Sequence, residues 1–158
     1  MGNLTYDGNV RLFLVDTIAD IDAPTVAEIG AGTEITTSVP KDGWSVQNAP
    51  SKVDTGNLST LYESEVMGTY KLNCELTILL DDADSTILDL FAVHGDAAYI
   101  VELPYKGTGA VAASDVSHVF PIESGKATPN PTAANERQTA MVPIAVTAEP
   151  SLNGAVAA

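Results

Sequence analysis

The chain has 158 residues, of which 45% are hydrophobic and only 18% are charged. This predicts one folded domain over residues 1–158, with a core large enough to need no disulfide. Acidic residues outnumber basic ones by 21 to 7, for a formal net charge of -14. That balance argues against binding to nucleic acid or to anionic membranes, because both depend on lysine and arginine. Solubility alone explains an acidic surface equally well.

Alternation of apolar and polar residues, which is typical of strands, recurs along most of the chain. A short helical turn after Pro24 fits between the first two strands, closed by Gly30 and Gly32. The expected strands are residues 9–16, 33–40, 70–80, 97–105, 114–127 and 137–149. Strands with few helices predict a mainly β fold, a sandwich or barrel with one flanking helix.

The clearest of these strands, residues 70–80, would span ~36 Å, which is long for a small domain. Its apolar face includes Cys74, the only cysteine, which we expect to be a small core side chain. The opposite face carries Lys71, Asn73 and Glu75. A single cysteine also excludes an internal disulfide and a multi-cysteine metal site.

Residues 40–60 are dense in turn formers and predict a long loop, which is unusual inside a compact domain. The only tryptophan, Trp44, lies in this loop, together with Val46, Val53 and Asp54. At the other end, residues 150–158 are mostly small and predict a flexible tail.

The segment from Leu79 to Asp96, LLDDADSTILDLFAVHGD, clusters four aspartates and a histidine. Asp82 and Asp84 resemble the start of a calcium loop, but the glycine and the distant glutamate of that motif are missing. Helix capping explains the aspartates better. We therefore expect a helix at about residues 84–94, whose apolar stripe covers the sheet.

Signatures of catalysis, cofactors and membrane insertion are missing from the sequence. The two histidines, His94 and His118, fall on different elements, and no nucleophile elbow, P-loop or zinc-protease motif occurs. No apolar run approaches the ~20 residues of a membrane span, and the first residues do not resemble a signal peptide. We therefore expect no enzymatic activity, metal or cofactor, and synthesis in the cytoplasm of the cell that makes the protein.

Three features remain that a monomeric enzyme does not explain: the over-long strand, the long loop with the sole tryptophan, and the loose tail. Each could be completed by a neighbouring chain, and pairing between chains protects an exposed strand edge. These features predict a structural oligomer.

Three motifs resemble the major tail tube proteins of long, non-contractile-tailed bacteriophages that infect actinobacteria and related hosts. They are APTVAEI at Ala23–Ile29, VDTG at Val53–Gly56 and PIAVTAE at Pro143–Glu149, and the likeness covers nearly the whole chain. The resemblance implies six copies in a ring and rings stacked into a tube, with strands joined in one continuous barrel around the lumen through which the genome leaves. It also implies that the long loop and the terminal arms bridge neighbouring subunits and rings.

The resemblance further implies a place in the virion tail and a set of partners. These are other copies of the chain, the tape measure protein, the tail terminator and the distal tail proteins, with DNA passing without specific binding and no membrane.

DNA carries one negative charge per about 1.7 Å of its axis, so an acidic lumen would let it slide. We predict that Asn73 and Glu75 line the lumen together with Glu63, Glu65 or Glu102. Lys71 on the same face counts against an unbroken acidic wall.

Two interpretations of the long loop stay open. In the first, Trp44 anchors an adjacent subunit, with Val46, Val53 and Asp54 nearby. In the second, Trp44 packs on its own domain. The rival functions are a tube protein of a contractile tail or secretion system, a monomeric ligand-binding β-barrel and, less favoured by the missing motifs, a hydrolase.

Overall fold

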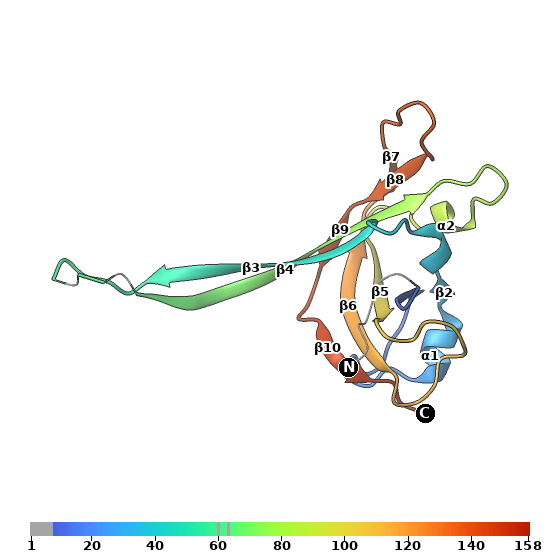
Figure 1. The fold of residues 1–158 in the computed structure, drawn as a ribbon. Helices are drawn as coiled ribbons and strands as arrows, with labels where there is room; N and C mark the ends of the chain where they lie inside the picture. Colours follow the sequence, from blue (N-terminus) through green and yellow to red (C-terminus); the bar gives the residue numbers. More distant parts are fainter. Residues whose placement is uncertain (1–7, 60, 63) are drawn as a thin grey trace.

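The computed structural model describes residues 8–59, 61–62 and 64–158. These residues form two antiparallel sheets, which make a compact body with one long hairpin projecting from it (Figure 1). The predicted mainly β sandwich is confirmed.

The larger sheet has the strand order β10-β6-β5-β1-β2, and β9 also pairs with β6. Strand β6 is shared, because β10 pairs with its first half and β9 with its last three residues. The bounds are β1 Arg11–Val15, β2 Thr33–Glu34, β5 Asp96–Leu103, β6 Val116–Ser124, β9 Ile144–Val146 and β10 Ser151–Ala155.

The smaller sheet has the order β3-β4-β8-β7. Strand β4 pairs with β8 only over Leu76–Leu79, whereas β3 pairs with β4 as far as its first residue, Glu65. Most of β4 therefore has one partner only. The bounds are β3 Trp44–Asp54, β4 Glu65–Leu79, β7 Thr128–Pro129 and β8 Thr139–Val142.

Two apolar layers hold the body together, one on each face of the larger sheet. The first fills the space between the sheets, and its fully buried members include Leu76, Ile100 and Phe120. Cys74 also lies there, as predicted. The second lies behind the larger sheet, where Phe13 and Val101 pack against Ile29. Burial on both faces explains why β1 reads as an uninterrupted apolar run rather than an alternating one.

Helix α1, Val26–Ala31, covers the second layer through its buried Ile29. Its start is fixed by a capping box in which the Thr25 hydroxyl accepts from the Glu28 amide, and the Glu28 carboxylate accepts from the Thr25 amide at 2.8 Å. The helical turn predicted after Pro24 is therefore confirmed and covers the back of the sheet.

The helix predicted at about residues 84–94 is much shorter, because α2 spans only Thr86–Asp89. The predicted use of an aspartate is correct, since the Asp84 carboxylate accepts a hydrogen bond from the Thr86 amide at 2.9 Å. Beyond α2 the chain turns, and Phe91 is buried between the sheets. The apolar stripe thus reaches the core without a full helix.

Three other predicted boundaries are wrong. The strand at residues 33–40 ends after Glu34 and continues as a 3-10 turn, η1, Thr36–Ser38. The loop at residues 40–60 is mostly strand β3. The flexible tail at residues 150–158 is strand β10, with Val156 buried behind the larger sheet. Backbone hydrogen bonds fix β3 along β4 and β10 along β6. The pattern of side chains in the sequence does not reveal such pairing.

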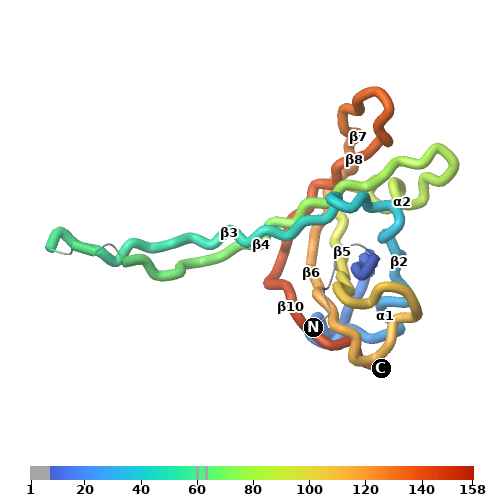
Figure 2. The backbone as a smooth tube through the Cα atoms, in the orientation of Figure 1, coloured from blue at the N-terminus to red at the C-terminus, as the bar shows by residue number. Residues whose placement is uncertain are grey.

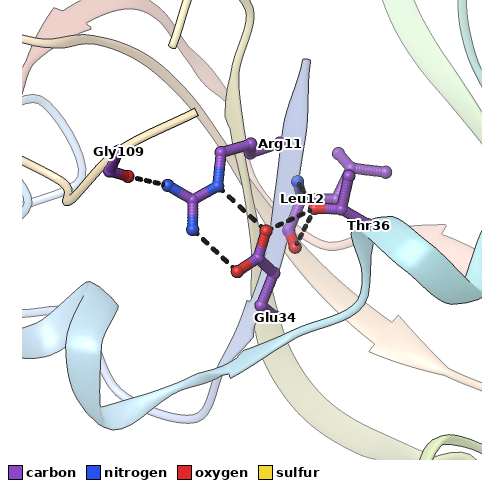
Figure 3. Close-up of polar contacts among 5 residues, drawn as sticks. All are labelled: Arg11, Leu12, Glu34, Thr36 and Gly109. Atoms are coloured by element: carbon purple, nitrogen blue, oxygen red, sulfur yellow. Dashed lines mark hydrogen bonds and ion pairs between the residues drawn. The ribbon is translucent and has the colours of Figure 1, made fainter. Parts of the chain in front are cut away.

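Arg11 joins the edge strand β2 to the body (Figure 3). Its guanidinium donates to both Glu34 carboxylate oxygens, at 2.9 and 2.7 Å, and to the Gly109 carbonyl. It also lies 5.1 Å from the centre of the Phe13 ring. This guanidinium holds the pKa of the Glu34 carboxyl below its usual range. The contacts fix β2 and the loop after β5 in one arrangement.

Candidate functional site

The projecting hairpin, which we call the arm, comprises residues 47–71 from β3, β4 and their connection. Figures 1 and 2 show it extending to one side, well away from the body. Every described residue of the arm is exposed. At the usual rise, the 15 residues of β4 span ~50 Å. A two-stranded ribbon of this kind is only marginally stable by itself, so the arm would gain stability from any surface that covers it.

A β-bulge divides the arm into two parts. The register shifts between Pro50 and Lys52, where Ser51 faces both Gly68 and Thr69. The Ser51 hydroxyl donates to the Thr69 carbonyl at 2.9 Å. A side chain at position 68 would begin 2.8 Å from the Ser51 oxygen, which explains the glycine.

Large apolar side chains concentrate on the outer part of the arm and at its tip. Val53 and Val66 face each other across the ribbon and are each 52% exposed. At the tip, Leu58 and Leu61 are fully exposed and Tyr62 is 80% exposed. A soluble monomer rarely gathers exposed apolar groups in this way, and such a gathering indicates an interaction surface.

The root of the arm is tied to the segment between β9 and β10. The Tyr70 hydroxyl donates to the Glu149 carboxylate, and this hydrogen bond raises the pKa of Tyr70. The contact links the direction of the arm to the C-terminal part of the chain.

The outward face of the four-stranded sheet is polar. Asn73 and Glu75 are exposed there, opposite Gln47 and Ser45 of β3. Lys71 lies on the same face, so its charge offsets that of Glu75. The sequence correctly placed these residues on one exposed face, while the face carries no acidic excess.

The other three predicted lining glutamates do not join them. Glu63 lies outside the described residues. Glu65 is on the outer arm, where its carboxylate lies 3.2 Å from the Lys52 ammonium. Glu102 is 9% exposed and faces the interior between the sheets, so its predicted position on a lumen wall is wrong. Strand β5 has apolar residues on both of its faces. The sequence therefore does not show whether its glutamate points to the interior or to the surface.

Burial raises the pKa of the Glu102 carboxyl, while the Trp44 indole N–H and His118 partly oppose this shift. The indole nitrogen makes no hydrogen bond of normal length to a described residue, so its stabilisation of the carboxylate is weak. Folding therefore shifts the Glu102 carboxyl toward its neutral form.

A raised pKa means that the folded chain holds a proton which the unfolded chain releases. The free energy of unfolding therefore falls as the pH rises from the usual glutamate pKa through the raised one. We expect Glu102→Gln to remove this loss and to raise the free energy of unfolding by about 1 kcal/mol at pH 8. Urea titrations at pH 4 to 8 measure it, with the exposed Glu123→Gln as the matched control. A difference from wild type that does not vary with pH would contradict the assignment.

Trp44 packs inside its own subunit. It is 7% exposed, and its ring meets Phe120 edge-on with 5.5 Å between ring centres. Trp44 therefore needs no adjacent subunit for its burial, and the alternative that it packs on its own domain holds. A contact between its remaining surface and a neighbouring subunit stays a prediction. The tryptophan marks the point where β3 leaves the core.

The remaining loop residues are placed along the arm. Val46 is 37% exposed at the root, opposite the buried Cys74. Val53 and Asp54 are exposed on the outer part. Sequence reasoning missed the tip residues Leu58, Leu61 and Tyr62, although apolar residues among turn formers were a usable signal.

Within residues 8–59, 61–62 and 64–158, groups suited to chemistry do not gather elsewhere. Burial raises the pKa of Cys74 to about 11, so its thiol stays protonated at neutral pH. The His118 ring accepts a hydrogen bond from the Asn153 amide. Among the described residues no three histidine, cysteine or acidic side chains are placed to hold a metal ion. Within the same residues, no helix has the length and apolar character needed to cross a membrane.

A family model described as "Phage tail tube protein" matches residues 2–158. No curated protein matches the sequence.

Proposed function

The chain belongs to the phage tail tube protein family, and from this we propose that it forms hexameric rings that stack into the tube of a long, non-contractile tail. The protein is a structural component of the virion tail and not an enzyme. Following the sequence resemblance, the phage would infect an actinobacterial host, in whose cytoplasm the subunit is made.

The observation that carries this proposal is the arm. It is exposed on both faces, bears apolar side chains along its outer half and extends far from the body. A neighbouring subunit that covers the arm would remove this apolar surface from water, at about 25 cal/mol per Å² buried. Assembly therefore supplies the stabilisation that an isolated ribbon lacks.

The four-stranded sheet supports ring closure. Its edge strands, β3 on one side and β7 on the other, can each accept a strand from a neighbour. Pairing edge to edge around a ring would close the sheets into one barrel and leave no exposed edge.

We propose that the outward face of this sheet lines the lumen, with Asn73 and Glu75 contributing from β4. Because Lys71 balances Glu75, the wall would be close to neutral and polar. Such a wall offers DNA neither a row of cations nor strong repulsion, so DNA would pass without specific binding. A tube structure with Glu75 on the outer wall would refute this assignment.

The tube would also meet other tail proteins. We infer a tape measure protein within the lumen, a terminator at one end and distal tail proteins at the other.

Negative-stain electron microscopy of the purified protein tests the proposal. We expect hollow tubes or six-fold rings. A monomer that persists at high concentration would argue against self-assembly and favour the monomeric alternative.

A further inference from the structure

The tip of the arm presents three apolar side chains with no cover from their own chain. Leu58 and Leu61 are as exposed as in an extended peptide, and Tyr62 is 80% exposed. Three large apolar groups within five residues need an apolar receptor elsewhere.

An apolar pocket of about 180 Å³ lies beside the point where the arm leaves the body. Leu12 and Trp44 form part of its wall, and Lys41 contributes a cation. An apolar cavity of ~150 Å³ accepts a benzene-sized ligand, so this one has room for a leucine side chain. The residues that line it are Gly8, Val10, Leu12, Thr36, Val39, Pro40, Lys41 and Trp44.

Two other hollows are less suitable for apolar side chains. One near α2 is lined by Asp81, Asp82 and Asp84. The groove at the root of the arm includes Lys71 and Glu149. Of these three, the pocket at Trp44 matches the chemistry of the tip best.

The tip cannot reach the pocket of its own subunit. Trp44, in the pocket wall, begins β3, and Asp54, beside the tip, ends it. Ten residues of extended strand separate them by ~33 Å, and the arm points away from the body (Figure 2). An occupant of the pocket that comes from an arm must belong to a second copy.

We propose that the arm tip of one subunit docks over the pocket at Trp44 of the next subunit, so that Leu58 enters the pocket while Leu61 and Tyr62 pack around its mouth. The inference rests on the proposed assembly and names the surface that receives the arm. Donor and receptor are different surfaces of one chain, so the contact is head-to-tail and repeats without limit or closes in a ring.

Mixing two variants that each carry one added cysteine, Leu58→Cys and Val39→Cys, tests the docking. After assembly and mild oxidation with copper phenanthroline, we expect a disulfide-linked dimer on a non-reducing gel. Each variant oxidised alone is the control for Cys74, which is buried. A mixture of Leu58→Cys with Leu152→Cys, on the exposed side of β10, is the matched control for chance collisions and is expected to give no dimer.

The outcomes separate this inference from the proposed function. If the mixed variants form tubes but no disulfide, another surface receives the tip and the docking is refuted while the tube stands. If neither tubes nor disulfides form, both proposals fail.

A second measurement needs no cysteine. Leu58→Ser removes one buried leucine from the contact and is expected to raise the critical concentration for assembly about tenfold or more. Val93→Ser is a comparable apolar-to-polar change of an exposed residue on the body. It is expected to leave the critical concentration unchanged. Equal effects of the two would contradict the docking.

Discussion

Replacing residues 51–69 by Asn-Gly is expected to abolish tube formation and to leave the body folded. The change removes the arm beyond the paired residues Pro50 and Tyr70 and closes the strands with a two-residue hairpin turn. All residues removed are exposed in the described structure, so the core loses nothing. The apolar surface that would hold neighbours together is lost entirely.

Two measurements read this result. Sedimentation and electron microscopy report assembly, and a urea titration followed by circular dichroism reports the fold. We expect a single slowly sedimenting species whose unfolding midpoint stays close to that of wild type. Tubes of normal length from the shortened chain would show that the arm is not the link between subunits.

Removing residues 151–158 is expected to have the largest effect on the fold itself. The segment pairs with β6, buries Val156 and places Ala157 in backbone hydrogen bonds with Pro24 and Val26. The Ser151 hydroxyl also donates to the Asp22 carboxylate at 2.6 Å. Its loss opens the edge of β6 and uncovers the apolar layer beside α1.

A graded series makes this second prediction quantitative. Val156→Ala is expected to lower the free energy of unfolding by ~2 kcal/mol, since it removes two buried methyl groups. The truncation is expected to lower the free energy of unfolding several times more. Because domains usually unfold with a free energy of about 5–15 kcal/mol, this loss would be a large part of the total. Leu152→Ala, on an exposed side chain of the same strand, is the control and should change little. A truncated chain with the wild-type urea midpoint would contradict the structural role of β10.

The sequence predicts the body of this fold better than its extensions. The alternation of apolar and polar residues correctly places Cys74, Leu76 and Ile78 inside, because this part of β4 has one buried face and one face exposed to solvent. The same rule cannot identify β3, whose residues are almost all exposed and therefore follow no pattern. Turn formers such as Asn48 and Pro50 favour a loop locally, but pairing along β4 overrides that preference.

The candidate interaction residues were also predicted unevenly. Asn73 and Glu75 lie on the exposed face expected for them, whereas Glu102 is buried because its strand is covered on both sides. A tryptophan inside a predicted loop leaves open which surface covers it, whereas the start of β3 at Trp44 places its ring against Phe120. The C-terminal segment has small side chains and little pattern, and it is held mainly by backbone hydrogen bonds and by Val156.

The arm leaves the body on one side only, and this has a consequence for any stack built from it. In a tube whose layers are joined by the proposed docking, each layer would point its arms in the same direction, and the tube would have polarity. One end would show unused arms, and the other would show unused pockets. The two ends would therefore differ chemically, and a protein that caps one of them could not cap the other by the same contacts.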